Sequence, residues 1–233
     1  MATKVCVVAG AGPGTGAALS RRFAAGGYRV AMLARDSDRL AALEREIDGS
    51  RGYAVDVGDA AGVKDVIARI TADLGTPGVL VHNAVAGHFG EFLDVPPEAL
   101  EQTFRTNVMS LMHLGQALVP AMIEHGGGAI VVTGNTSAWR GSANFAGFAP
   151  SKAAQRILAQ AMARSLGPKG IHVAYVVIDA VIDVPWTRAA FGSRPDEFFA
   201  RPAAVADTVF HITQQDRSAW TFEVDLRPFG EKW

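Results

Sequence analysis

Short runs of β-branched and other apolar residues alternate along the chain with longer segments in which apolar residues recur at helical spacing. The runs are apolar at consecutive positions, which is typical of strands that are covered on both faces. They predict strands at Lys4–Ala9, Tyr28–Ala34, Arg51–Val55, Gly78–His82, Ile130–Thr133, Ile171–Ile178 and Ala219–Leu226. The segments between them predict helices within Gly14–Ala25, Ser37–Ile47, Ala60–Leu74, Pro97–Glu124, Ser151–Leu166 and Ala203–Gln214.

This alternation predicts a Rossmann-type α/β fold, in which a doubly wound parallel sheet lies between two layers of helices. Parallel neighbours need a crossover connection, and right-handed crossovers place helices on both faces of the sheet. The sequence contains no internal repeat, low-complexity segment or linker that would divide it. We therefore expect a single domain over residues 1–233, with an irregular insertion at 184–200.

Composition and charge exclude several classes of protein. The chain of 233 residues is 49% hydrophobic and 19% charged, so it has enough apolar surface to offset the entropy of ordering and is not a disordered chain. Its net charge of −1 gives no electrostatic reason to expect binding to nucleic acid or to an anionic membrane. The single cysteine, Cys6, is too few for a disulfide or a thiolate zinc site, and no metal is predicted.

The chain also lacks targeting signals. No apolar run approaches the ~20 residues that a membrane helix needs. The first residues enter an apolar strand at once and show no secretory signal. We therefore expect a soluble cytoplasmic protein whose partner is a small-molecule substrate.

A glycine-rich turn after the first predicted strand indicates a nucleotide site. The segment Gly10-Ala11-Gly12-Pro13-Gly14-Thr15-Gly16 joins that strand to the first helix. Glycine allows a tight turn and removes the Cβ atoms that would keep a pyrophosphate away from the amides at a helix N-terminus. The position of the turn disfavours a purely structural role. We predict that the following residues bind the phosphates of a dinucleotide: Gly10, Gly12, Gly14, Thr15 and Gly16.

The end of the second predicted strand indicates which dinucleotide is bound. A ribose contact is expected about 20 residues after the turn, where the chain reads Leu33-Ala34-Arg35-Asp36. Arg35 could bind a 2′-phosphate through charge-assisted hydrogen bonds worth about 1.5–3 kcal/mol. We expect NADP(H) in preference to NAD(H), although Asp36 could rotate toward the ribose and weaken that preference. The alternative is that Arg35 is a solvated surface residue.

The spacing of Gly10, Gly14 and Gly16 resembles the Gly-x-x-x-Gly-x-Gly turn of the short-chain dehydrogenase/reductase family. Further segments resemble this family in the same order along the chain: Asp56-Val57, His82-Asn83-Ala84-Val85-Ala86-Gly87, Asn107 and Ser151-Lys152-Ala153-Ala154. The resemblance implies that Asp56 and Val57 contact the adenine and that Asn83 also lines the cofactor. It further implies that Asn107 positions a water in a proton relay and that Lys152 binds the nicotinamide ribose.

The resemblance fails at the residues that carry the family's chemistry. The family has a tyrosine four residues before its lysine and a serine about 13 residues before the tyrosine, where this chain has Phe148 and Asn135. Phenylalanine keeps an aromatic surface but has no proton to donate, and general acid–base catalysis is worth about 10²–10⁴-fold in rate. We therefore expect an atypical proton relay around Phe148.

The source of the missing proton stays open at this point. It could come from Lys152, from a water held by Asn107 and Lys152, or from the hydroxyl of Thr136 or Ser137. Asn135 could polarise the acceptor by donating a hydrogen bond. A substrate that arrives already protonated, such as an iminium, would need no such donor.

Three functions agree with these residues. We favour an NADP(H)-dependent oxidoreductase that acts on a small carbonyl, alcohol or imine. Its substrate is expected to be apolar or ring-bearing, because aromatic residues fill segment 184–200, which is the substrate lid in the family. The alternatives are a nucleotide-binding protein without turnover, as a sensor or an oligomer partner, and a non-redox enzyme with His88, Asp179 or Asp183 as acid–base groups.

Two further expectations concern the edge of the sheet and the assembly. Asp179 follows the sixth strand at the carboxyl edge where ligands bind in such sheets, so we include it among the cofactor-binding residues. The helix Ser151–Leu166 is rich in alanine, which allows helices to approach closely. Because members of the family commonly pair through this helix, we expect a homodimer or homotetramer.

Overall fold

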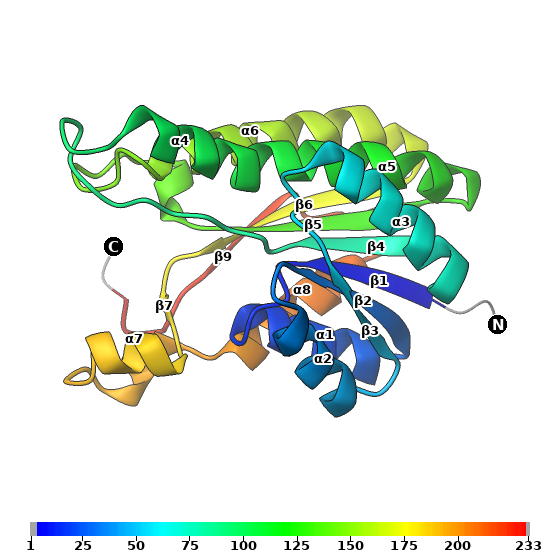
Figure 1. The fold of residues 1–233 in the computed structure, drawn as a ribbon, viewed down its shortest axis with the longest axis horizontal. Helices are drawn as coiled ribbons and strands as arrows, with labels where there is room; N and C mark the ends of the chain where they lie inside the picture. Colours follow the sequence, from blue (N-terminus) through cyan, green and yellow to red (C-terminus); the bar gives the residue numbers. More distant parts are fainter. Residues whose placement is uncertain (1–3, 232–233) are drawn as a thin grey trace.

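The computed structural model describes residues 4–231 (Figure 1). In that part of the chain, seven strands form one parallel sheet in the order β3-β2-β1-β4-β5-β6-β9. The chain builds outward from β1 in one direction and then from β4 in the other. A sheet of this kind opens a crevice where the order reverses, at the carboxyl ends of β1 and β4. The predicted doubly wound α/β fold is confirmed.

Most elements begin and end within a few residues of their predicted bounds. The sheet contains β1 (Lys4–Ala9), β2 (Tyr28–Ala34), β3 (Ser50–Ala54), β4 (Pro77–His82), β5 (Gly128–Gly134), β6 (Ile171–Ile178) and β9 (Glu223–Leu226). The α-helices are α1 (Thr15–Ala25), α2 (Ser37–Glu46), α3 (Ala60–Leu74), α4 (Pro97–Phe104), α5 (Ser110–Glu124), α6 (Ala149–Leu166), α7 (Pro185–Ala190) and α8 (Pro202–Thr213).

Shorter elements complete the chain. Segment 184–200, which we expected to be irregular, instead contains α7 and β8 (Phe199–Ala200), and β8 pairs in parallel with β7 (Val181–Ile182) outside the main sheet. The remaining helical turns are η1 (Arg105–Met109), η2 (Thr136–Ala138), η3 (Gly167–Lys169) and η4 (Asp196–Phe198). η1 is a single π-helical turn between α4 and α5, and such turns are frequent at functional sites.

Two apolar layers explain why the strands are apolar at consecutive positions. Helices α3, α5 and α6 cover one face of the sheet, and α1, α2 and α8 cover the other (Figure 1). Along β1, Val5 and Val7 belong to the first layer, whereas Cys6 and Val8 belong to the second. Burying one such side chain contributes about 1.5–3 kcal/mol, so both layers stabilise the sheet.

Helix α6 begins where its proline requires. Pro150 lies in the first turn of α6, after the N-cap residue Phe148. An amide at this position has no partner within the helix, so proline costs no hydrogen bond there. The start of α6 therefore brings Phe148 to the end of the sheet that carries the crevice, with Lys152 one turn later.

Candidate active site

A cavity of 590 Å³ opens at the carboxyl ends of β1, β2 and β4. Most of the residues that the sequence predicts for the cofactor line it: Gly10, Gly12, Gly14, Thr15, Gly16, Arg35, Asp56, Val57 and Asn83. Among the described residues, the cofactor candidates Lys152 and Asp179 lie outside this lining. The carboxylate of Asp179 instead lies 3.9 Å from Nη2 of Arg140.

The glycines of the turn have different tasks. A Cβ atom on Gly16 would lie 2.2 Å from the carbonyl oxygen of Gly10, and one on Gly10 would lie 2.5 Å from the amide nitrogen of Ala84. Gly10 also has a φ of +90°, a conformation that residues with a side chain rarely adopt. In contrast, no described heavy atom lies within 4 Å of the Cβ position on Gly12. Gly10 and Gly16 thus allow the turn to pack, and Gly12 keeps one side of the turn open to the cavity.

Two arginines lie at the β2 end of the cavity. Arg35, just before the N-cap of α2, and Arg39, in the first turn of α2, both line the cavity. The carboxylate of Asp36 accepts a hydrogen bond of 3.0 Å from the amide of Arg39, as the N-cap of α2, and pairs with the guanidinium of Arg39 at 3.0 Å. Asp36 therefore caps its own helix and pairs with Arg39, while it also lines the cavity. The sequence analysis missed Arg39, although the helix predicted from Ser37 places it in the first turn after the end of β2.

Asn83 ties the end of β4 to the glycine turn. Its Nδ2 group donates to the carbonyl oxygen of Gly10 at 2.9 Å, and its Oδ1 atom accepts from the hydroxyl of Thr133 at 3.0 Å. Asn83 therefore positions the turn from the side of the neighbouring strand, in addition to lining the cavity.

Asn107 lies at the π-helical turn and is fully buried. Its Oδ1 atom accepts from the amide of Ala86, and its Nδ2 group donates to the carbonyl oxygen of Ala86, both at 2.9 Å. The same Nδ2 group donates to the hydroxyl of Ser151 at 2.8 Å. The side chain of Asn107 thus fixes the loop after β4 against the start of α6.

Lys152 is turned into the protein core, with only 2% of its surface exposed. Its Nζ group donates to the carbonyl oxygen of Thr133 at 3.2 Å and to Oε1 of Gln155 at 2.5 Å. The Nε2 group of Gln155 in turn donates to the carbonyl oxygen of Asn107 at 2.8 Å. Burial lowers the pKa of Lys152 to about 7, because the charged amine loses its contact with water.

His82 and Ser110 continue this buried network. Nδ1 of His82 lies 3.3 Å from Nε2 of Gln155, and Nε2 of His82 lies 2.6 Å from the hydroxyl of Ser110. Burial, together with the nearby Lys152, lowers the pKa of His82 to about 3, so the imidazole is neutral. The sequence analysis did not select Gln155 or His82. The available signal was that Gln155 follows Lys152 by three residues on one face of a helix.

An aromatic cluster surrounds the position where the family has its tyrosine. Phe148 is 5% exposed, and its ring centroid lies 5.3 Å from that of Phe89 and 6.3 Å from that of Phe145. The hydroxyl candidate Thr136 begins η2, and Asn135 caps it by accepting from the amide of Ser137 at 3.1 Å. The Oδ1 end of the Asn135 amide is therefore committed to this cap.

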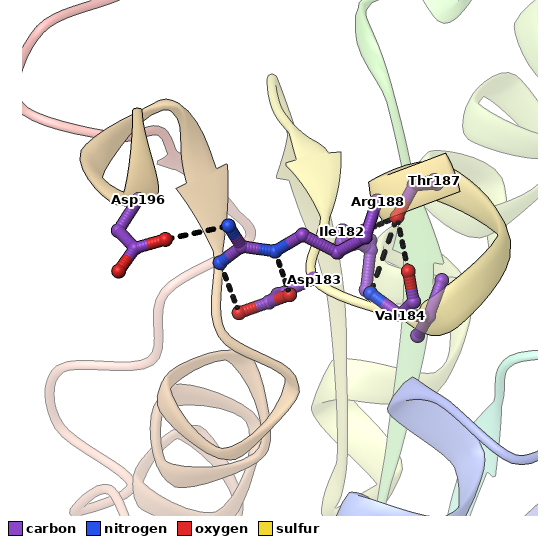
Figure 2. Close-up of polar contacts among 6 residues, drawn as sticks. All are labelled: Ile182, Asp183, Val184, Thr187, Arg188 and Asp196. Atoms are coloured by element: carbon purple, nitrogen blue, oxygen red, sulfur yellow. Dashed lines mark hydrogen bonds and ion pairs between the residues drawn. The ribbon is translucent and has the colours of Figure 1, made fainter. Parts of the chain in front are cut away.

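An ion-pair cluster holds the segment after β7 (Figure 2). Arg188 of α7 binds both carboxylate oxygens of Asp183, at 2.6 and 2.9 Å, and donates to Asp196 at 2.6 Å. Its guanidinium also lies 4.0 Å from the ring centroid of Phe199. This pairing lowers the pKa of Asp183, and it commits that carboxylate to a structural role. Trp186, in the same helix, is 70% exposed and lines the cavity.

Thr187 fixes the start of α7 (Figure 2). Its hydroxyl shares its one hydrogen between the carbonyl oxygens of Ile182, at 2.5 Å, and Val184, at 2.8 Å, and accepts from the amide of Val184 at 3.1 Å. Ile182 and Val184 both line the cavity. The turn that begins α7 is therefore part of the wall of the cavity.

No group of three or more histidine, cysteine, aspartate or glutamate side chains within residues 4–231 could hold a metal ion. No helix within the same range is both long and apolar enough to cross a membrane.

Comparison with known proteins identifies the family. The sequence model for short chain dehydrogenase matches residues 4–190. Human L-xylulose reductase is 30% identical over 243 aligned positions, covering 100% of this chain and 98% of that protein. L-rhamnose 1-dehydrogenase (NAD(P)(+)) of Azotobacter vinelandii is 39% identical over 179 positions, covering 72% of this chain and 70% of that protein. The structure of a metagenomic short-chain oxidoreductase in complex with NADP matches with a TM-score of 0.84 at 27% identity, over 97% of each chain. The chain therefore belongs to the short-chain dehydrogenase family.

Proposed function

We propose that the protein is an NADP(H)-dependent oxidoreductase whose substrate is a small, apolar or ring-bearing carbonyl, alcohol or imine. The observation that carries this proposal is the cavity at the glycine turn, whose β2 end holds Arg35 and Arg39 while Asp36 caps α2. The bound cofactor would supply or accept a hydride at its nicotinamide ring. The related metagenomic oxidoreductase, whose structure contains NADP, supports this choice of cofactor.

Different residues of the cavity would bind different parts of the cofactor. The amides around Gly12 and Gly14, at the N-terminus of α1, would bind the pyrophosphate, since helix N-termini attract anions. Arg35 and Arg39 would bind the 2′-phosphate through charge-assisted hydrogen bonds. The adenine would lie against the pair Asp56 and Val57 at the end of β3.

The substrate would lie between aromatic surfaces and receive its proton by an atypical route. Phe89, which is 57% exposed and packs on the buried Phe148, and Trp186, which lines the cavity, offer apolar ring surfaces that favour an apolar or aromatic substrate. Asn135 would polarise the acceptor atom through its Nδ2 group. The proton would come from Thr136, from Lys152 or from water, and a protonated imine would need none of these donors.

A second candidate function is nucleotide binding without turnover. The observation that favours it is the position of Lys152, whose Nζ group binds Gln155 and the carbonyl of Thr133, and which does not line the cavity. A protein that keeps its lysine in the core could bind the phosphates and the adenosine and still fail to reduce a substrate.

Calorimetric titration with NADPH and NADH tests the cofactor. We expect Arg35→Ala to weaken NADPH binding by about 10-fold or more and to leave NADH binding unchanged, because only NADPH carries the 2′-phosphate. Arg45→Ala, at the exposed far end of α2, is the matched control. If NADPH does not bind to the wild-type protein, the proposal is wrong. NADPH binding without oxidation across panels of ketones, aldehydes and imines would favour the second candidate.

A further inference from the structure

We propose that Gln155 is a positioning residue for Lys152: its side-chain amide fixes the place of the Nζ atom, and the pair His82 and Ser110 fixes that amide. The inference rests on the proposed function, because Lys152 matters to the reaction only if a dinucleotide binds. It assigns Gln155 to the active site, although Gln155 is fully buried and does not line the cavity among the described residues.

The network leaves one consistent arrangement of hydrogen atoms. The hydroxyl of Ser110 donates to the carbonyl oxygen of Thr106 at 2.5 Å, so it accepts from Nε2 of His82. The Nδ1 atom of a neutral His82 must then be the acceptor, and it faces Nε2 of Gln155 at 3.3 Å. The second hydrogen of that Nε2 group goes to the carbonyl oxygen of Asn107.

This arrangement determines which end of the amide faces Lys152. Both hydrogens of the Gln155 amide have acceptors in His82 and Asn107, so its oxygen must point the other way. That oxygen accepts from the Nζ group of Lys152 at 2.5 Å. A flip of the amide would place two donors against each other at Lys152 and leave His82 without its donor, which is costly in a buried site. Gln155 thus offers Lys152 an acceptor and no proton.

The amide oxygen favours the ammonium form of Lys152 in surroundings that otherwise oppose it. Of the elements packed around Nζ, β4 contributes His82, which is titratable, while β5 contributes the carbonyl of Thr133 and η1 contributes Asn107. Arg156, the next charged residue on α6, is paired with Glu223 of β9. Removal of the Gln155 acceptor would therefore leave Nζ with only the longer, 3.2 Å bond to Thr133.

Stability measurements across pH test the assignment without any nucleotide. The free energy of unfolding in urea is measured between pH 4.5 and 10 for the wild type, Gln155→Met and Gln155→Glu, each with and without Lys152→Met. The pH at which the Lys152-dependent difference begins to rise reports the pKa of Lys152 in the fold. Gln116→Met, at an exposed position of α5, is the control for loss of a glutamine.

We expect this onset to move down by about one pH unit or more in Gln155→Met, because the charged amine of Lys152 loses a hydrogen bond. In Gln155→Glu the onset should move up, because Lys152 gains a neighbour of opposite charge. The control should leave the onset unchanged. If Gln155→Met does not fold, Gln155→Glu decides the question alone. An onset that stays within about 0.3 pH unit of the wild type in the folded variants would overturn the proposal.

NADPH binding separates this inference from the proposed function. If the wild type binds NADPH, the pH dependence of its affinity should shift in the same directions in the two Gln155 variants, and an unshifted profile would contradict a role for Gln155 at the site. If the wild type does not bind NADPH, the proposed function fails, while the stability measurements still decide whether Gln155 acts on Lys152.

Discussion

Replacement of Lys152 by methionine should make the stability of the protein depend less on pH. The pKa of Lys152 lies near 7 in the fold, below the ordinary value of 10.5, because the side chain is buried. Between these two values the unfolded chain binds more protons than the folded chain does. The free energy of unfolding of the wild type therefore contains a contribution from Lys152 that is unfavourable below pH 7 and rises as the pH increases from 7 toward 10.5.

The size of this effect follows from the difference between the two pKa values. One pKa unit corresponds to about 1.4 kcal/mol, so the contribution of Lys152 rises by roughly 1 kcal/mol per pH unit within the window. Between pH 7 and pH 9 the gain is about 2 kcal/mol, a sizeable part of the 5–15 kcal/mol that typically stabilises a domain. Lys152→Met removes the titrating group and keeps an apolar stem of similar length.

Urea unfolding at pH 7, 8 and 9 measures this difference. The stability of the wild type minus that of Lys152→Met should increase by about 2 kcal/mol over this range. Lys64→Met, at an exposed position of α3, should show a constant difference. The thiol of Cys6, whose pKa burial raises, is present in every variant and cancels. A flat difference between wild type and Lys152→Met would refute the view that Lys152 is desolvated in the fold.

Three further predictions test the glycine turn, the segment 184–200 and the presence of Phe148 where the family has a tyrosine. Gly12→Ala should weaken NADPH binding in calorimetry and leave the thermal melting temperature unchanged. Gly16→Ala should destabilise the fold by about 1–3 kcal/mol, because its Cβ would meet the carbonyl of Gly10. Equal melting temperatures for the two variants would contradict this prediction. Arg188→Met should speed chymotrypsin cleavage within 184–200, since α7 loses three hydrogen bonds to carboxylates, and an unchanged cleavage rate would argue against the ion-pair cluster. Phe148→Tyr should raise NADPH-dependent ketone reduction by roughly 10-fold or more, and an unchanged rate would show that proton donation is not limiting.

The sheet and the edge that carries the cavity could be predicted from the sequence because both depend on local patterns. Consecutive apolar positions define the strands, and the rules for crossovers then place Gly12, Arg35, Asp56 and Asn83 at the same edge. These residues come from separate turns, yet each follows directly after a strand. Their meeting in one cavity needed no knowledge of side-chain conformation.

The direction of Lys152 could not be predicted in the same way. The helix and the position of Lys152 within it follow from the sequence, but whether Nζ points to the cavity or into the core depends on acceptors from other elements. Thr133 lies in β5, and the amide of Gln155 is oriented by His82 of β4 and by η1. The order within 184–200 escaped prediction for a similar reason, since Arg188 joins residues on both sides of α7.

The buried hydrogen-bond network also limits how this protein could be re-engineered. Within this network, His82, Ser110 and Gln155 each donate a hydrogen bond and accept another, and Lys152 donates to Gln155. A substitution at one of these positions therefore leaves a buried polar atom of a neighbouring residue without its partner. Effects of such exchanges are strongly non-additive. A library that randomises one of these positions at a time would return few working variants, whereas joint randomisation of Gln155 with His82 could reach an apolar pair of matching volume. The network is thus an epistatic unit, and a new catalytic centre in this scaffold would have to replace it as a whole.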